Sequence, residues 1–293
     1  MNKLWESFVN FFKGLLIDGI TENITNVFSE FDHYVDISSS FTSATPQGFN
    51  GVVFNFISEI TDTVIAPLAG IIISFVLIYE LISAVMDRNS FHDIDSWFLF
   101  KFLGKACIGV FVVSHTAEIV NAIFELGSFL STNVINRITQ STNVNHVYHI
   151  NAMLYQTELE NMGFAQLFGN LIETFIVKWA VRFMGLLIAV ISLGRFMEIY
   201  LYMSVAPVPF STFANREWGS IGTNYLRGLL ALAFQGFLMA LCIGIYSSMI
   251  QALYGVTYDS FSNMCFALMI YTVVLVFALL KTGSLSKQIF NAH

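Results

Sequence analysis

The segment GLLALAFQGFLMALCIGIYSSMI, residues 228–250, carries no charged side chain over its whole length. A helix rises about 1.5 Å per residue, so about 20 apolar residues match the roughly 30 Å hydrocarbon core of a bilayer. Only 11% of the chain's 293 residues are charged, whereas soluble domains carry about 25%. Because so few charged groups cannot cover a water-exposed surface, we expect an integral membrane protein.

Five apolar segments are predicted to cross the membrane. They are residues 64–86, 106–124, 172–205, 228–250 and 264–280. The second is weaker, and the third, at about 51 Å as a helix, is longer than one bilayer core requires. We interpret the third as one long helix with Lys178 and Arg182 at or near the interface and possible bends at Gly185 and Gly194. Two shorter helices in its place would give six spans.

The chain begins with an amphipathic stretch. Residues 4–20 place aromatic and aliphatic side chains at helical spacing, which predicts a helix lying in the interface or against a partner. Glu6, Asn10 and Lys13 interrupt it, so it does not read as a signal peptide. Residues 37–51 read as a loop.

The predicted fold class is therefore all-α, a polytopic membrane protein with about five transmembrane helices and an N-terminal amphipathic helix. We expect four parts along the chain. They are an N-terminal extracytoplasmic segment (1–63), the first two transmembrane helices (64–124), an extracytoplasmic loop (125–171) and a three-helix transmembrane region with a proline break (172–293).

Basic residues near short loops predict the orientation, because they favour the cytoplasmic side. With the N-terminus outside, the inner side holds Arg88, Lys101, Lys105, Arg216, Arg227, Lys281 and Lys287. The outer side then holds Lys3, Lys13 and Arg137, with Lys178 and Arg182 near its boundary. This excess predicts an outer N-terminus and a cytoplasmic C-terminus.

Charge and motifs argue against several classes of protein. The net charge of −7 and the lack of a Lys/Arg-rich run argue against nucleic-acid binding as the main activity. Cys107, Cys242 and Cys265 lie far apart in apolar stretches, so we expect buried thiols rather than metal or disulfide partners. There is no GxSxG, HExxH or phosphate-binding glycine loop. We expect no enzyme activity, no cofactor and no metal.

Charged side chains inside spans are costly and therefore mark candidate functional positions. Arg195 and Glu198 lie three residues apart on one helix face and can pair locally, and Tyr202 follows one turn later. The pair either fixes this helix to its neighbours or contributes to a polar conduit. Glu80 lies near the inner end of its span and either reaches the interface or pairs with Lys101 or Lys105.

His115 and Glu118 form a second pair at i, i+3 spacing inside a predicted span. A proton relay needs such groups, but two residues do not make one, and the spacing favours a structural or interfacial role.

Pro207 and Pro209 predict a sharp end to the long helix, because proline lacks an N–H and favours an extended residue before it. The following residues 211–227 read as an amphipathic return with Arg216 and Trp218 at the interface. We expect this segment to dock a cytoplasmic partner.

The stretch GRFMEIYLYMSVAPVPFSTFANREWGSIGTNYLRGLLALAFQGFLMAL, residues 194–241, shows an Arg-x-x-Glu helix, a tyrosine-rich turn and an Ala-Pro-x-Pro break. It resembles the TrbL-like inner-membrane channel subunits of conjugative type IV secretion systems, especially those of Gram-positive mobile elements. The resemblance implies transfer of DNA, usually with a bound relaxase, powered by separate cytoplasmic ATPases. The expected partners are other secretion subunits, those ATPases, the transferred DNA, the lipid bilayer and further copies of the chain.

Two other function classes are compatible with the composition. A secondary transporter or ion channel would need a polar site at the membrane midplane, often beside broken helices. A structural membrane protein would need no conduit at all. Neighbouring genes for coupling ATPases and a relaxase would favour conjugation over both.

Overall fold

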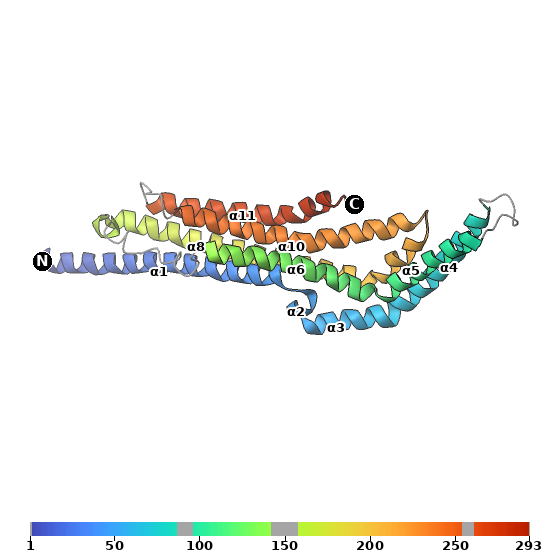
Figure 1. The fold of residues 1–293 in the computed structure, drawn as a ribbon. Coiled ribbons are helices and arrows are strands. Elements are labelled where there is room, and N and C mark those ends of the chain that lie inside the picture. Colours follow the sequence, from blue (N-terminus) through green and yellow to red (C-terminus); the bar gives the residue numbers. More distant parts are fainter. Residues whose placement is uncertain (1, 87–95, 142–157, 254–260, 293) are drawn as a thin grey trace. The chain divides into compact units, whose positions relative to one another are not determined.

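The computed structural model describes residues 2–86, 96–141, 158–253 and 261–292, and every regular element in these ranges is helical (Figure 1). The elements are α1 (Asn2–Ser43), α2 (Pro46–Phe49), α3 (Gly51–Ile60), the π-helical turn η1 (Thr61–Ile65), α4 (Ala66–Met86), α5 (Ser96–Ser114), α6 (Thr116–Ser141), α8 (Phe164–Val205), α9 (Pro207–Phe210), the 3₁₀ turn η3 (Ser211–Ala214), α10 (Gly219–Leu253) and α11 (Phe261–Ile289). Arg88, one of the basic residues used to predict orientation, lies outside these ranges.

The predicted all-α, multi-pass fold is confirmed. Four stretches are long and apolar enough to cross a membrane, namely Gly51–Ser83, Phe164–Val205, Gly219–Ile250 and Phe266–Ile289. A fifth candidate is the pair Phe100–Ser114 and Thr116–Ile138, which is bent by 66°. A straight span over 106–124 is therefore wrong, because the helix breaks at His115. The six-span alternative is also wrong, since α8 is one continuous helix.

The N-terminal helix is longer than predicted. It begins as expected but continues through Ser43, so the first half of the loop predicted at 37–51 is helical. Serine and threonine favour loops because their hydroxyls compete for the backbone. Here the hydroxyls of Ser40 and Thr42 donate back to helix carbonyls three residues earlier, and Ser38 and Thr42 are buried. Packing thus overrides local propensity.

Residues 125–171, expected as a loop, are helical at both ends. α6 continues to Ser141 and α8 begins at Phe164. Whether this segment lies outside the cytoplasm, and the four-part division to which it belongs, stay predictions.

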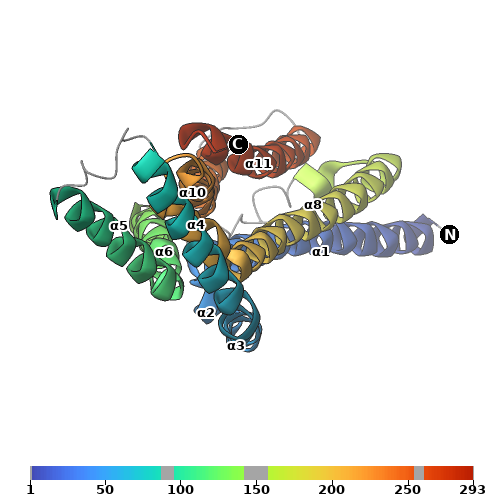
Figure 2. The same ribbon diagram turned by 90° about the vertical axis from the view of Figure 1, so that its right-hand side faces the viewer.

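The chain forms two compact units. Unit 1 comprises Met1–Thr42, Ser131–Ser192 and Met239–Lys281, and unit 2 comprises Ser43–Leu130, Leu193–Leu238 and Thr282–His293. In unit 1, α1 runs beside the first half of α8 and in the same direction (Figures 1 and 2). Lys13 donates to the Met162 carbonyl at 2.8 Å, and further along the pair Asn23 donates to Thr174 at 3.5 Å.

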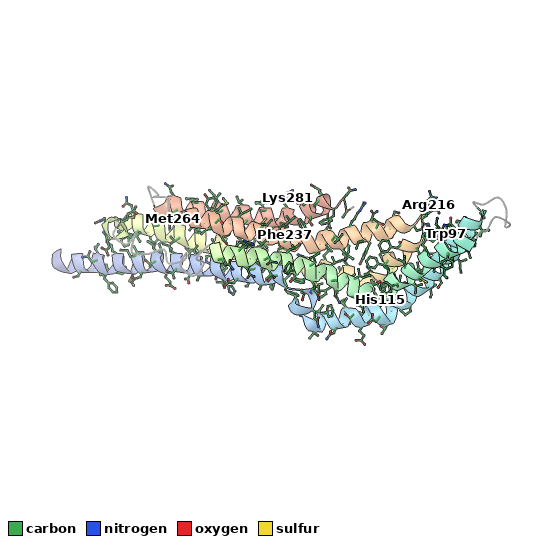
Figure 3. The ribbon with its side chains drawn as sticks, viewed as in Figure 1. Trp97, His115, Arg216, Phe237, Met264 and Lys281 are labelled. Atoms are coloured by element: carbon green, nitrogen blue, oxygen red, sulfur yellow. The ribbon has the colours of Figure 1, made fainter. Side chains whose placement is uncertain are left out.

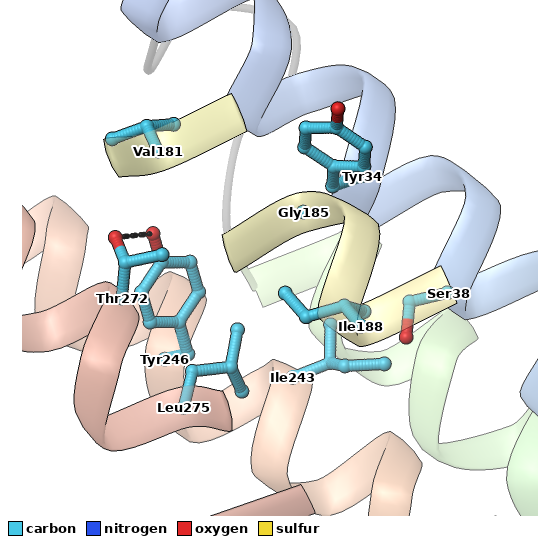
Figure 4. A pocket seen from close by; sticks show the side chains of 9 residues that line it. All are labelled: Tyr34, Ser38, Val181, Gly185, Ile188, Ile243, Tyr246, Thr272 and Leu275. Carbon is cyan, nitrogen blue, oxygen red and sulfur yellow. Dashed lines mark hydrogen bonds between the residues drawn. The ribbon is translucent and has the colours of Figure 1, made fainter. Parts of the chain in front are cut away.

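Close approach of α1 to α8 in unit 1 depends on a glycine. A Cβ at position 185 would lie 1.9 Å from the Tyr34 ring, so Gly185 makes room for an aromatic side chain rather than a bend. The residues around it enclose a cavity of about 10 Å³ (Figure 4). The buried apolar core of unit 1 comes from α1, α8, α10 and α11 and includes Ile20, Leu167, Met239 and Leu279.

In unit 2, α4 and α5 form an antiparallel hairpin. Glu80 pairs with Lys105 near one end, and Ile73 lies beside Gly109 further along. The first half of α10 runs antiparallel to the end of α8 and to the end of α11. Arg195 contacts the Leu232 carbonyl, and the Ser286 hydroxyl donates to the Ala231 carbonyl at 2.5 Å.

The prediction of buried thiols is wrong for Cys107, which is exposed on α5, while Cys242 is partly buried. A thiol is weakly polar and needs no burial where the surrounding solvent is lipid. The side chain of Cys265 lies outside the described part of the chain.

Candidate functional site: the broken helix of unit 2

The proline pair breaks α8 without ending the helical path. α8 ends at Val205, and Pro207 begins the short helix α9, which leads directly into η3. Ala206 has φ −53° and ψ −38°, which is helical rather than extended as predicted. Proline is tolerated in the first turn of a helix, where its missing N–H would have no partner. The break therefore produces a new turn.

Backbone carbonyls freed by such a break need other donors, because a membrane offers no water to bind them. Hydroxyl groups supply these donors, some from neighbouring helices and some from the broken segment (residues 202–212) itself. Thr61 of η1 donates to the Ser204 carbonyl at 3.2 Å, and the Tyr225 phenol of α10 donates to the Tyr202 carbonyl. Neither Thr61 nor Tyr225 was among the site residues predicted from the sequence.

Within the segment, two short-range hydroxyl bonds complete the pattern. The Ser211 hydroxyl donates to the Val208 carbonyl at 2.6 Å, and the Thr212 hydroxyl to the Pro209 carbonyl at 2.7 Å. The segment from Tyr202 to Thr212 is thus an irregular but well-bonded path.

Another proline, Pro67, accounts for the π-helical turn that carries Thr61. Pro67 has no N–H to bond the carbonyl four residues earlier, and the preceding turn widens into η1, in which the Ala66 N–H bonds the Thr61 carbonyl. Single π-turns of this kind are rare in proteins as a whole, but those that occur are often found at functional sites. Here the turn carries the hydroxyl that reaches the broken helix.

The chain around the break lies along η1 and α4. Just before the break, the Ser204 carbonyl accepts from Thr61 of η1, and after it the Arg216 N–H donates to the Glu80 carboxylate of α4 at 3.2 Å. Thr61 and Glu80 lie about 28 Å apart along their helix, close to one hydrocarbon thickness. Ser211, Thr212, Ala214 and Asn215 are buried. The amphipathic return predicted over residues 211–227 therefore begins with a largely buried part, residues 211–215, which pack against α4 and α5.

The end of this segment is fixed to α4 by polar and aromatic contacts. Glu80 pairs with Lys105, which is one of the two partners predicted for it. Its carboxylate also accepts a hydrogen bond from the Arg216 N–H. The Tyr79 phenol donates to Glu217 at 3.0 Å, and the Trp218 ring stacks on Tyr79 with centroids 5.1 Å apart.

Asn215 and the predicted residue Arg216 also lie near this end. Asn215 Oδ1 accepts the N–H groups of Glu217 and Trp218 at 2.7 and 2.9 Å, which turns the chain into α10. The side chain of Arg216 is exposed, beside the start of α10 (Figure 3).

The predicted pair of Arg195 and Glu198 does not form. Glu198 instead binds Lys287 of α11, with the two charged atoms 2.9 Å apart. Tyr202, on the same side of α8, stacks on Tyr225 at 5.3 Å. Local spacing allowed the first pair, but the Arg195 side chain reaches the Leu232 carbonyl of α10 instead.

Arg195 is 5% exposed and forms no ion pair among the described side chains. Its Nε donates to the Leu232 carbonyl at 3.5 Å, and its guanidinium lies 5.5 Å from the centre of the Phe196 ring. A Cβ at position 236 would lie 2.5 Å from a guanidinium nitrogen, so Gly236 makes the space. A buried cation without a carboxylate is costly, and such residues in membranes mark functional positions.

His115 lies at the bend between α5 and α6 (Figure 3). Its Nδ1 lies 2.9 Å from the Phe111 carbonyl, so this nitrogen carries the proton, and its Nε2 lies 3.9 Å from the Glu118 carboxylate. The predicted proximity of His115 and Glu118 is confirmed. The His115 side chain is partly exposed and that of Glu118 is exposed, and His115 is separate from the broken helix.

The site offers bonded irregular backbone, a buried guanidinium and one ion pair. Over the described ranges no group of three His, Cys, Asp or Glu side chains could hold a metal ion. This arrangement can hold helices in a fixed geometry within a membrane.

The profile of one protein family matches the chain. It is described as TrbL/VirB6 plasmid conjugal transfer like protein, and it matches residues 32–207, which is more than half of the chain. No curated protein sequence and no solved structure matches. The match includes Thr61, Glu80 and Arg195 and ends at Pro207. Only its last residues therefore overlap the stretch 194–241, on which the resemblance seen in the sequence rests.

Proposed function

Because the chain belongs to the TrbL/VirB6 plasmid conjugal transfer like family, we propose that it is a channel or scaffold subunit of a conjugative type IV secretion machine. In this role it supports the transfer of relaxase-bound DNA across the cell membrane without catalysis of its own. The family match carries the proposal, and the multi-pass helical fold agrees with a membrane subunit of a conjugal transfer system. A machine of the Gram-positive type stays a prediction.

The broken helix supports a scaffold role. The chain on either side of its buried segment is bonded to η1 through Thr61 and to α4 through Glu80. Irregular backbone is stable at membrane depth only where protein or a cavity surrounds it. We infer that unit 2 presents a fixed surface to other components of the machine.

The exposed residues that follow the buried segment are the best candidates for a partner surface. Arg216, Glu217 and Asn224 are exposed there. We assign this surface to a cytoplasmic ATPase of the machine, with the N-terminus outside and the C-terminus inside the cell. Further copies of the chain and the transferred DNA complete the expected partners.

A clean deletion of the gene tests the proposal. Donor cells without it should transfer DNA at background frequency, and a wild-type copy supplied in trans should restore transfer. Plasmid copy number in the donor serves as the control for replication. Transfer at full frequency by the deletion strain would remove the conjugation proposal.

A transporter or ion channel is the second candidate, and one observation favours it. Arg195 is buried at a broken helix, and broken helices surround the substrate sites of many transporters. If this alternative holds, the purified protein in liposomes would conduct ions or take up a solute, and the deletion would leave DNA transfer unchanged.

A further inference from the structure

A groove opens beside the proline break in unit 2. Its volume is about 570 Å³, within the range typical of ligand sites. Its lining comes from the end of α8 and α9, the start of α10, and the end of α11 with the residues that follow. The lining residues that matter for its chemistry are Leu201, Tyr202, Val205, Ile221, Asn224 and Lys287.

Part of the groove's lining is apolar and exposed. Leu201, Val205 and Ile221 are 63%, 43% and 54% exposed. All three belong to stretches that qualify as membrane spans. Exposed apolar side chains on a span face hydrocarbon chains rather than water, so an acyl chain is the natural neighbour of this wall.

The polar part of the lining carries one lysine. Lys287 lines the groove, with Asn224 and the Tyr202 phenol, and no carboxylate is present among the described residues of the lining. Lys287 Nζ binds Glu198 at 2.9 Å. An ammonium has three N–H donors, so two of them remain for an anion in the groove.

We propose that this groove binds one anionic phospholipid, with its headgroup phosphate at Lys287 and an acyl chain along Leu201, Val205 and Ile221. The combination of a cation and an apolar wall selects this occupant. A free anion would gain nothing from the wall, and an apolar helix of another protein would leave the lysine facing hydrocarbon. Basic pockets between membrane helices bind anionic headgroups in this way.

Native mass spectrometry of the full-length protein in detergent, titrated with phosphatidylglycerol, tests the proposal. The wild type should retain one phosphatidylglycerol more tightly than phosphatidylcholine, and excess inorganic phosphate should not displace it. Lys287→Gln should weaken retention about fivefold, the factor that ~1 kcal/mol per lysine near an anionic headgroup provides.

Two further variants separate the lipid site from the ion pair. Glu198→Gln also breaks the pair but leaves the cation, so it should retain phosphatidylglycerol at least as well as the wild type. Lys281→Gln removes an exposed lysine of the same helix that does not line the groove, and it should behave as the wild type.

Four results would overturn the proposal. Three of them are equal retention of the two lipids by the wild type, unchanged retention by Lys287→Gln, and a loss in Glu198→Gln as large as that in Lys287→Gln. Displacement of the lipid by inorganic phosphate would also overturn it, since it would leave no role for the apolar wall.

Discussion

Thr61 shows how a single hydroxyl stabilises irregular backbone inside a membrane. Its single hydroxyl proton is shared between the Ile57 carbonyl, at 2.8 Å from Oγ1, and the Ser204 carbonyl, at 3.2 Å. Thr61→Val keeps the shape and removes the donor, so it should lower the free energy of unfolding by about 1–3 kcal/mol. The melting temperature of the purified protein in detergent measures this loss.

A matched control lies two residues away. Thr63 is exposed, and its hydroxyl bonds only the Glu59 carbonyl of its own helix at 2.6 Å. Thr63→Val should change stability by less than about 0.5 kcal/mol. Equal melting temperatures for the two variants would show that the bond to Ser204 does not stabilise the break.

Arg195 is the residue for which stability and function should diverge. A buried charge without a carboxylate partner costs stability, and an apolar replacement of similar volume is often neutral or stabilising. Arg195→Met should therefore reach the membrane at or above the wild-type level while DNA transfer falls by roughly tenfold or more. Immunoblotting of membranes and conjugation frequency measure the two effects.

The exposed Arg182 provides the comparison for this variant. Arg182→Met should leave transfer near the wild-type frequency. Full transfer by Arg195→Met would assign Arg195 to packing alone.

Residue by residue, sequence spacing predicted proximity along a helix better than contacts across the bundle. It predicted His115 beside Glu118, and it offered Lys105 as one partner of Glu80. It failed for Glu198 because the actual partner, Lys287, lies on a helix 89 residues later. Thr61 gave no signal beyond the nearby Pro67, since a threonine in an apolar stretch is ordinary.

Close helix packing at the element scale depends on Gly127 of α6. A Cβ there would lie 2.6 Å from the Ala233 carbonyl oxygen of α10, and backbone cannot move aside as a flexible side chain can. Gly127→Ala should therefore destabilise the protein by about 1–3 kcal/mol, the usual cost of overpacking, and lower its melting temperature.

Gly104 of α5 is the control position, because nothing lies within 4 Å of a Cβ there. Gly104→Ala should be neutral or slightly stabilising, as expected where alanine replaces glycine in a helix. A Gly127→Ala variant as stable as Gly104→Ala would contradict the close contact of α6 and α10.

Hydropathy predicted the membrane-spanning elements because apolar length is a direct requirement of the bilayer. It did not predict how far the helices extend beyond the apolar stretches, as in α1, which continues through Ser43, and α6, which continues to Ser141. It also missed the bend at His115 and the buried path of residues 211–215. These features depend on contacts with distant segments, which local composition does not encode.

At the scale of the whole molecule, the bent pair α5–α6 decides the topology. If it crosses the membrane as one span, Asn133 lies outside the cell and the C-terminus inside. We predict this arrangement from the positions of the basic residues. Single cysteines at Asn133 and near His293, in a variant whose own three cysteines are replaced, can be labelled in intact cells with an impermeant reagent.

The prediction is that the cysteine at 133 reacts and the one near 293 is protected. A protected cysteine at 133 would mean that the pair enters and leaves the membrane on the same side. A reactive C-terminal cysteine would reverse the orientation.

The central claim is that the broken helix is the part of this membrane protein that DNA transfer requires. Replacing both Pro207 and Pro209 with Ala restores two N–H donors, so α8 can continue and residues 211–218 lose their path along α4. The most direct measurement is the conjugation frequency of a deletion strain that carries this double variant, compared with the wild-type gene at equal membrane level. We predict near-normal protein in the membrane with transfer close to that of the deletion strain, whereas transfer at the wild-type frequency would contradict the claim.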